Sequence, residues 1–472
     1  MSADEKQDDI LITGATVLTL DADRQVIPNG AVAVTGGRIA AVGGSDELRG
    51  RFPEMETLDA SGKAVLPGFI NSHTHAVLLV LRGTVEDMSG DAIFGYMTPI
   101  SFAMTDGERS ALARLACLEA IRCGTTTMVE PFRFITGYGA AMAETGMRLW
   151  LSENGADALT LKIRHGVYEY DRAFGEEFLE RIRAMVDQFH DTYDGRVKCQ
   201  MAAHAPDVCS PWMLGELNDL ARKHNLTRTI HLAQSPGEIK QVRTAHDRTP
   251  AEYLRDNDWL GSDVVAAHWT FCTDVDIELL AEHGVHMAHC PANSSRRGPH
   301  LARIGRIQDA GVNIVLGTDN MTEDMFQAMK IGCIIHRGRR GSEREGGVDP
   351  APQTVLDAVT RNAARALGEE AQIGSLEAGK KADLTILDLN QPNLRPVINL
   401  VSNIVHYGSS NAVESVMIDG RFVMRDRKVL AMNESDVIGE AQEATVAAWH
   451  RLKETSGDID LPAGLRKEGA SQ

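Results

Sequence analysis

Eight short apolar segments alternate with helical segments between residues 67 and 372, and this alternation limits the fold more than any other feature of the chain. The expected strands lie at residues 68–72, 125–130, 148–153, 197–203, 227–232, 263–268, 286–290 and 312–319. Apolar strands that alternate with helices predict a parallel sheet covered on its outer side, and eight such units close into an α/β barrel of the TIM type, (β/α)8. A doubly wound open sheet is the alternative, but no G-x-G-x-x-G sequence follows any of these strands.

The helical segments carry recognisable start signals. Amphipathic patterns lie between the strands, as at residues 106–123 and 174–190, and a third at residues 211–224 follows Ser210. Because Ser is a favoured N-cap and Pro suits the first helical position, this third helix is expected to begin at Pro211.

Both ends of the chain have a β-type pattern that the central segment lacks. Residues 10–20, 31–42 and 56–66 alternate like antiparallel strands, as do residues 382–389 and 413–424, which contain the hairpin signal Asp419-Gly420. Neither group could bury a face alone, so we expect residues 1–66 and 373–430 to form one small β-sandwich domain beside the barrel of residues 67–372. Residues 431–472 are expected to form a packing helix at 437–453 and a loose end.

Charge and composition exclude several kinds of partner. The chain has 472 residues, a net charge of −18 and a pI near 5.4. Nucleic-acid binding needs clustered Lys and Arg, and a negative net charge gives no attraction to anionic lipid, so neither partner is expected. Residues 1–9 lack the apolar core of a signal peptide, and no apolar run has the length of a membrane span. Seven cysteines without a C-x-x-C pair indicate reduced, buried thiols in a cytoplasmic protein.

Polar side chains that can bind a metal ion stand where the expected strands end. His73 and His75 follow the first strand, and a spacing of two residues places both imidazoles on one side of an extended chain. His231, His268 and Asp319 end the fifth, sixth and eighth strands. Because active sites of such barrels lie at the carboxyl ends of the strands, these five residues predict one metal site.

Several stretches of the sequence resemble the amidohydrolase superfamily, in particular its cytosine deaminase and triazine chlorohydrolase branch. They are LPGFINSHTH at 66–75, HLA at 231–233, HCP at 289–291, GTD at 317–319 and IGSLEAGKKADL at 373–384. The resemblance implies a mononuclear site in which His73, His75, His231 and Asp319 bind the ion and His268 lies next to its water. Binuclear relatives carry a carboxylated lysine at the end of strand four, whereas Lys198 lies too early in this strand.

One position departs from the ring deaminases and chlorohydrolases that the chain resembles. Those enzymes place Glu three residues after the strand-five His, but this chain has Gln234, and an amide cannot shuttle a proton. Glu238 lies four residues further along and is the one nearby substitute. A divalent cation lowers the pKa of its water to roughly 7, after which Asp319 can relay the proton and His268 can orient the water or stabilise the oxyanion.

Hydrolysis at a substrate carbonyl needs no ring protonation. The presence of Gln234 therefore favours hydrolysis of an amide, urea, carbamate or thiocarbamate C–N bond in a small, largely apolar molecule. Phenylurea hydrolases and molinate hydrolases are the preferred comparison within the superfamily. An aminohydrolase or dechlorinase acting on an N-heterocycle of the triazine, purine or pyrimidine type is the alternative. A metal-free scaffold is the non-enzymatic alternative, although every ligand position is retained.

The remaining site predictions concern substrate contacts and the ion. The expected substrate-binding residues are His204, Gln234, Glu130, His289 and Asn320. Glu130 could instead form a structural pair with Arg133, and His289 could orient the loop after strand seven. Phe94, Tyr96, Met97 and Phe102 suit a lid over an apolar substrate. One zinc ion per subunit is the default, with Fe, Co or Mn as alternatives, and the resemblance implies a homo-oligomer, a dimer or larger.

Overall fold

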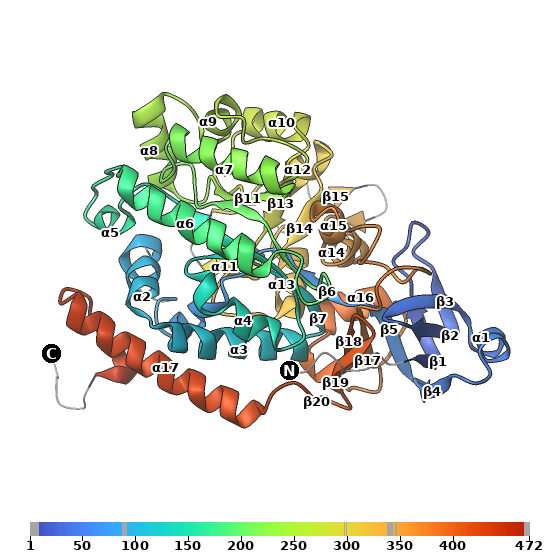
Figure 1. The fold of residues 1–472 in the computed structure, drawn as a ribbon. Coiled ribbons are helices and arrows are strands. Elements are labelled where there is room, and N and C mark those ends of the chain that lie inside the picture. The colour runs from blue at the N-terminus through green and yellow to red at the C-terminus, as the bar shows by residue number, and fades with distance from the viewer. Residues whose placement is uncertain are drawn as a thin grey trace.

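The computed structural model describes residues 9–86, 92–296, 298, 300–337, 343–344 and 347–466, and it shows a parallel barrel with a second sheet beside it (Figure 1). The barrel strands, in the order in which they pair, are β14 (Ile314–Leu316), β13 (His286–His289), β12 (Val264–His268), β11 (Arg228–Leu232), β10 (Met201–Ala203), β8 (Arg148–Gly155), β7 (Thr125–Phe132) and β6 (Phe69–Asn71). All neighbours in this series run parallel. The predicted barrel is confirmed, with one strand divided at Gln200, since β9 (Val197–Cys199) and β10 both lie beside β8.

Backbone hydrogen bonds between the segments that continue β6 and β14 join the two ends of this series. Ser72 N donates to Leu316 O at 3.0 Å, and Asp319 N donates to His73 O at 2.9 Å. His75 N in turn donates to Asp319 O at 2.8 Å. The closing contact of the barrel therefore lies directly beneath the expected metal ligands.

Helices cover the outside of the barrel, and their caps follow the sequence signals. They are α3 (Asp106–Arg122), α4 (Gly139–Ala143), α5 (Thr160–Ile163), α6 (Arg172–Phe189), α7 (Pro211–His224), α8 (Pro236–His246), α9 (Pro250–Asp256), α10 (Asp274–Glu282), α11 (Pro291–Arg296), α12 (Ile304–Asp309), α13 (Met325–Ile334), α14 (Pro352–Ala358) and α15 (Arg361–Ala366). The Ser210 side chain accepts a hydrogen bond from Met213 N, which confirms the predicted start of α7 at Pro211. Thr105, Thr249 and Thr273 form capping boxes at α3, α9 and α10.

The two ends of the chain share one sheet. Its strands pair in the order β20 (Lys428–Val429), β19 (Arg421–Arg425), β18 (Val413–Ile418), β17 (Leu384–Asp388), β5 (Lys63–Pro67), β1 (Ile10–Leu18), β2 (Val26–Thr35) and β3 (Arg38–Gly44), with β4 (Glu56–Asp59) on β1. β5 and β17 run antiparallel and bring the two terminal segments together. Helix α1 (Ser45–Arg51) packs on the outer end of this sheet (Figure 1).

Buried ion pairs connect the sheet domain to the barrel. Arg148, at the start of β8, donates from Nε to Asp383 Oδ2 at 2.6 Å and from Nη2 to Asp383 Oδ1 at 3.1 Å. Its Nη2 also lies 3.0 Å from Asp419 Oδ1. These bonds place the terminal sheet at the amino end of the barrel strands, away from the expected site. The boundaries of the domains stay a prediction.

The C-terminal helix α17 (Glu434–Thr455) runs along α3 at the edge of the molecule (Figure 1). Trp449 Nε1 donates to Val80 O at 2.9 Å, and Arg451 pairs with both carboxylate oxygens of Glu108. α17 is therefore a packing helix, and the expected loose end beyond residue 466 lies outside the described residues. None of the described helices combines the length and the apolar character that a membrane span requires.

Shorter elements complete the chain. They are η1 (Ala76–Leu81), η2 (Ile93–Met97), α2 (Thr98–Ala103), η3 (Ile135–Gly137), α16 (Leu400–Tyr407), η4 (Ser410–Ala412), η5 (Ala463–Leu465) and the hairpin of β15 (Glu343–Arg344) and β16 (Gly347–Val348). η1 and η2 with α2 form most of the described part of the long segment after β6, where the sequence predicted a lid.

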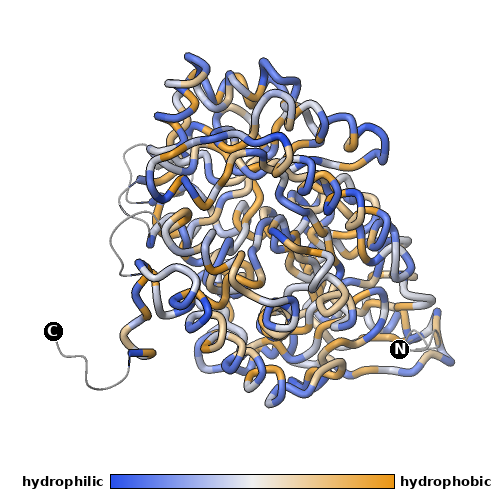
Figure 2. Tube along the Cα trace, turned by 60° about the vertical axis from the view of Figure 1, so that its left-hand side comes forward, coloured by the Kyte–Doolittle hydropathy of each residue, from blue (hydrophilic) through white to orange (hydrophobic). Residues whose placement is uncertain are grey.

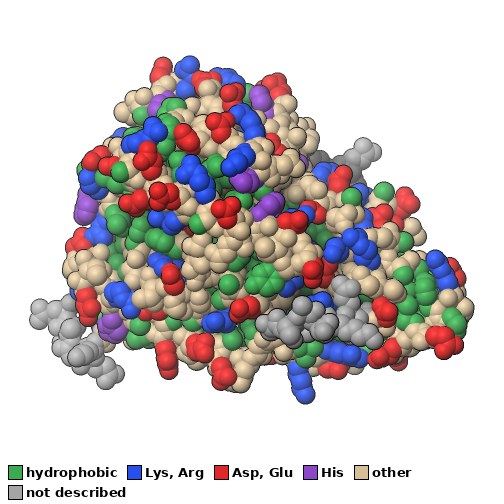
Figure 3. Space-filling view, in the orientation of Figure 1, with side chains coloured by type: hydrophobic (Ala, Val, Ile, Leu, Met, Phe, Trp, Pro, Cys, Tyr) green, Lys and Arg blue, Asp and Glu red, His purple; other side chains and the backbone are tan. Residues whose placement is uncertain are grey.

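Apolar side chains fill the inside of the barrel. Ile70, Val129, Val265 and Val315 from four barrel strands form one cluster, to which Leu367, just after α15, also belongs. Figure 2 shows apolar segments running through the interior and polar segments along the outer helices. On the face of the described residues drawn in Figure 3, acidic and basic side chains are interspersed. A barrel filled in this way keeps its two ends separate.

Candidate active site

The expected metal ligands reach one place from four barrel strands. His73 and His75 follow β6, His231 belongs to β11, His268 ends β12, and Asp319 follows β14. All five side chains are buried. Parallel strands of a barrel end at the same rim, which is why residues so far apart in the sequence meet here.

The distances between their donor atoms fit a single divalent cation. Ring nitrogens of His73, His231 and His268 lie within 4.8 Å of one another, and His75 Nε2 lies 3.2 Å from His231 Nε2. Two nitrogens bound to one tetrahedral zinc ion are roughly 3.3 Å apart, given Zn–N bonds of about 2.0–2.1 Å. Asp319 completes the donor set, with Oδ1 3.5 Å from His75 Nε2 and Oδ2 3.8 Å from His268 Nε2.

Hydrogen bonds around the ligands orient them. His231 Nδ1 lies 2.5 Å from the backbone carbonyl of His204, so this nitrogen is the donor and Nε2 is left to face the ion. Asn293 Nδ2 donates to Asp319 Oδ2, and Asn320 Nδ2 donates to Asp319 Oδ1 at 3.1 Å. Each oxygen of the Asp319 carboxylate is thus held by an amide.

The backbone beneath the site is strained and closely packed. Asp319 and His268 have φ values of 67° and 82°, in the left-handed region that non-glycine residues rarely adopt. A Cβ atom on Gly317 would lie 2.6 Å from His73 O and 2.8 Å from His73 Cβ, so only glycine lets these two segments approach. Strain of this kind is frequent at functional sites.

A buried carboxylate ties the two ligand-bearing segments together. Glu323 accepts hydrogen bonds from Thr74 Oγ1 at 2.7 Å, from Asn71 Nδ2 at 2.9 Å and from Thr318 Oγ1 at 3.2 Å. Thr74 lies between the two histidines after β6, and Thr318 precedes Asp319. Burial raises the pKa of Glu323 well above its usual range.

Two neighbouring cavities at the site share part of their lining. An inner chamber of about 30 Å³ is lined by His75, His231, His268 and Asp319, among others. An outer cavity of about 470 Å³ shares Ile93, Met97, Gln234 and His268 with the chamber and adds side chains that include Phe271, Val85 and Met321. A small polar chamber below a larger, partly apolar space suits a small molecule that has one reactive polar group.

The comparisons with known proteins agree with this geometry. The amidohydrolase family matches residues 64–423, and the imidazolonepropionase-like composite domain of bacteria matches residues 30–54. The chain belongs to the amidohydrolase family. It is a metal-dependent hydrolase that acts on carbon–nitrogen bonds other than peptide bonds.

Curated relatives of this amidohydrolase are deaminases. A 5-methylthioadenosine/S-adenosylhomocysteine deaminase of Syntrophobacter fumaroxidans is 34% identical over 91% of this chain and 96% of its own. A 5′-deoxyadenosine deaminase of Methanosarcina mazei is 31% identical over 92% of this chain and 97% of its own.

Solved structures share the fold over nearly the whole chain. An adenosine deaminase from Xanthomonas campestris with bound zinc is 25% identical, with a TM-score of 0.83 over 95% of this chain and 99% of that one. The atrazine chlorohydrolase TrzN from Arthrobacter aurescens TC1, complexed with zinc, is 21% identical, with a TM-score of 0.81 over 92% of this chain and 100% of that one. The second likeness concerns the fold alone.

The residues expected to contact substrate divide into two groups. His204, Gln234 and Asn320 line the inner chamber of the amidohydrolase. Glu130 lines neither cavity. Its carboxylate instead accepts hydrogen bonds from Ala76 N at 2.8 Å and from Tyr138 Oη at 2.8 Å. Burial raises the pKa of Glu130 to about 8.

The structure also corrects the pairing suggested for Glu130, since no ion pair joins it to Arg133. His289 lies outside both cavities as well, with Nε2 2.9 Å from His336 Nε2, so it braces the region behind the site.

Glu238 does not replace the missing glutamate in this structure. One carboxylate oxygen accepts Ala233 N at 2.7 Å and the other accepts Gln234 N at 2.8 Å. Its side chain lines neither cavity and braces the turn after β11. Proximity in the sequence therefore did not identify a substitute acid, because backbone N–H groups of the turn donate to both oxygens of the Glu238 carboxylate.

Several site residues escaped the sequence analysis. Asn154 lines the chamber, Asn293 binds Asp319, and Cys290 Sγ lies within 4.8 Å of metal-binding atoms of His73 and Asp319. Cys290 belongs to the HCP motif and Asn293 follows it closely, so that motif carried a signal for both. Asn154 near the end of β8 carried none, since a single amide has no characteristic spacing.

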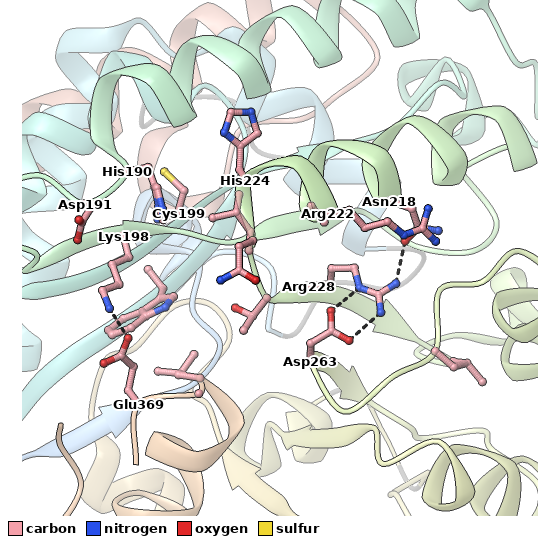
Figure 4. A pocket seen from close by; sticks show the side chains of 18 of the residues that line it. His190, Asp191, Lys198, Cys199, Asn218, Arg222, His224, Arg228, Asp263 and Glu369 are labelled. Carbon is pink, nitrogen blue, oxygen red and sulfur yellow. Dashed lines mark hydrogen bonds and ion pairs between the residues drawn. The ribbon is translucent and has the colours of Figure 1, made fainter. Parts of the chain in front are cut away.

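A further cavity of the amidohydrolase lies at the opposite end of the barrel, where the strands begin (Figure 4). It has a volume of about 800 Å³, and its lining includes Lys198, Arg228, Asp263 and Glu369. Arg228 forms two hydrogen bonds to Asp263, at 2.7 and 2.8 Å, and Lys198 pairs with Glu369. Lys198 and Arg228 are thus each paired with a carboxylate of the same lining.

Proposed function

We propose that this amidohydrolase hydrolyses the C–N bond of an amide, urea, carbamate or thiocarbamate in a small, largely apolar molecule. The chamber lining carries the proposal: among the described residues that form it, Asp319 is the single carboxylate. Protonation of a heterocyclic ring nitrogen calls for a second acid close to the substrate, whereas hydrolysis at a carbonyl group does not.

The position of Gln234 supports this reading. Gln234 lines both cavities, at the position where the ring deaminases that the chain resembles have Glu. The nearest alternative acid, Glu238, is held by the backbone of the same turn. Glu86 lines the outer cavity, where its carboxylate accepts a hydrogen bond from Gly83 N at 2.9 Å.

The chain's own residues supply proton transfer and orientation. His73, His75, His231 and Asp319 would hold one divalent cation, taken to be zinc, which supplies Lewis-acid activation of water near neutral pH. Asp319, fixed by its two amide donors, accepts the proton of the attacking water and returns it to the departing nitrogen. His268, whose Nε2 lies 3.8 Å from Asp319 Oδ2, orients the water.

A second candidate, deamination of an adenosine-type compound, is favoured by the relatives. The 34% identity to a 5-methylthioadenosine/S-adenosylhomocysteine deaminase extends over 91% of this chain. The two candidates differ in the product released, which is ammonia for the deaminase and a larger amine for most amides and ureas. Phenylureas and molinate, an N,N-disubstituted thiocarbamate, are suitable test substrates for the first candidate.

Replacing Gln234 with Glu separates the two candidates. The wild-type enzyme loaded with zinc is expected to release amines from anilides or phenylureas and no ammonia from 5′-methylthioadenosine. Gln234→Glu is expected to gain no ammonia release from that nucleoside. The control is Gln188→Glu, which adds the same charge at an exposed position of α6. Ammonia release by the wild type, or its appearance in Gln234→Glu alone, would overturn the proposal in favour of deamination.

A further inference from the structure

The inner chamber contains a hydrogen-bond acceptor whose capacity the protein does not use. Asn154, on β8, is 2% exposed, and its Nδ2 donates to Pro131 O at 2.8 Å. Because that bond identifies the nitrogen end of the amide, the remaining end is the oxygen, Oδ1. Within the described part of the chain, Oδ1 has no hydrogen-bond partner. A buried acceptor of this kind calls for an N–H or O–H donor from a ligand.

A buried donor lines the same chamber. Arg133 is 2% exposed, and its guanidinium donates to Ser101 Oγ at 3.1 Å and lies 3.4 Å from His204 Nδ1. It forms no ion pair with a carboxylate of the described residues, since the nearby Glu153 is paired with Arg181. Its hydrogen-bond partners are all neutral, which leaves its charge available for an oxygen atom of a ligand.

Together these two side chains fit a group that carries an N–H beside an oxygen acceptor. We propose that Asn154 Oδ1 accepts the N–H of the scissile amide or urea while Arg133 donates to an oxygen of the same group. This assignment rests on the proposed function. It narrows the substrate class of the enzyme to amides and ureas that keep at least one N–H. N,N-disubstituted carbamates and thiocarbamates would leave Asn154 Oδ1 buried without a donor.

Binding of two cyclic ureas tests the assignment without turnover. Imidazolidin-2-one has two N–H groups, and its N,N′-dimethyl derivative has none. Isothermal titration calorimetry on the zinc-loaded full chain is expected to give a dissociation constant at least about tenfold lower for imidazolidin-2-one, because the methylated urea cannot satisfy the buried acceptor. Equal dissociation constants would overturn the proposal.

A matched pair of variants separates hydrogen bonding from the bulk of the methyl groups. Asn154→Leu and Asn154→Asp both lose the donor to Pro131, but only Asn154→Leu loses the acceptor as well. The preference for the N–H ligand is expected to fall to within about threefold in Asn154→Leu and to persist in Asn154→Asp. A preference that survives in Asn154→Leu would show steric exclusion and overturn the proposal.

Turnover distinguishes this proposal from the function on which it rests. Acetanilide and N-methylacetanilide differ by the same N–H, and kcat/KM is expected to be at least about tenfold higher for acetanilide. If neither compound nor any urea is hydrolysed while the calorimetric preference holds, the proposed function falls and the binding assignment stands. If both anilides are hydrolysed at the same rate, the binding assignment falls alone.

Discussion

The two ends of the barrel differ in whether their charged and metal-binding side chains are already paired with one another. The amino end has the larger cavity, about 800 Å³, yet its cations Arg228 and Lys198 are paired with Asp263 and Glu369. The carboxyl end has a chamber of about 30 Å³ into which several imidazoles and one carboxylate converge. Convergence of metal-binding atoms, and not volume, therefore marks the active site.

Backbone geometry also distinguishes the two ends. At the carboxyl end, Ala233, His268 and Asp319 all adopt positive φ, which turns the chain where the strands end. Such conformations cost of order 1–3 kcal/mol each and persist where the surroundings enforce them. At the amino end, residues such as Arg228 and His286 lie at the start of their strands and form the pairs expected of a structural layer. In barrels of this type, that end serves stability.

The largest expected effect comes from removing one histidine at each end. His231→Ala deletes an imidazole from the donor set and should lower kcat/KM on the order of 10³-fold, with loss of bound zinc, because the ion supplies several kcal/mol of transition-state stabilisation. His286→Ala, the control at the start of β13, should change kcat/KM by less than about threefold. Zinc content by mass spectrometry and steady-state kinetics measure both. A variant at His231 that keeps zinc and activity would remove the distinction between the two ends.

A smaller effect is expected from one methyl group beneath the ligands. Gly317→Ala places a Cβ 2.6 Å from His73 O and 2.9 Å from His73 N, so the segment that carries His73 must shift. Misplacement of a ligand by about 1 Å should lower kcat on the order of 10²-fold. Gly215→Ala on α7, where an added Cβ meets nothing within 4 Å, should leave kcat unchanged. Equal kinetics for the two variants would show that the close approach is not needed.

The smallest effect concerns stability at the amino end. His286 accepts from Asn313 Nδ2 at 3.0 Å and contacts Ser262 O at 3.0 Å, so it is neutral, and burial lowers its pKa below the usual range. The folded state then binds fewer protons than the unfolded state at pH values just below about 6.5, so this contribution to stability is lost as the pH falls through that range.

His286→Gln keeps an acceptor and a donor but does not titrate. The free energy of unfolding of this variant should fall less steeply than that of the wild type below pH 6.5, by at most about 1.4 kcal/mol per pH unit. Urea denaturation between pH 5 and 8 measures the difference, and identical slopes would contradict the assignment of a neutral, buried imidazole. Arg365 and Asp263 act on the same ring and are common to both proteins.

The strands and the types of metal ligand could be predicted because both leave local signals. Runs of apolar and β-branched residues mark β7, β8 and β12 whatever their neighbours, and polar residues such as His268 stand out at their ends. The directions of loop side chains could not be predicted in this way. Glu130 and Glu238 look like candidate acids in the sequence, but donors that only the folded chain brings near occupy each carboxylate. Two backbone N–H groups donate to Glu238, and one backbone N–H and the Tyr138 hydroxyl donate to Glu130.

The sequence by itself determined the barrel, the order of its strands and the residue types at their ends, because strand and helix periodicity are properties of neighbouring residues. The tertiary structure decided which of those residues share a chamber, through the closing contact between His73 and Asp319 and the space that Gly317 leaves for it. It also decided that Asn154 and Arg133 line the chamber beside His204. These outcomes depend on hydrogen bonds and packing between distant segments, which no local pattern encodes.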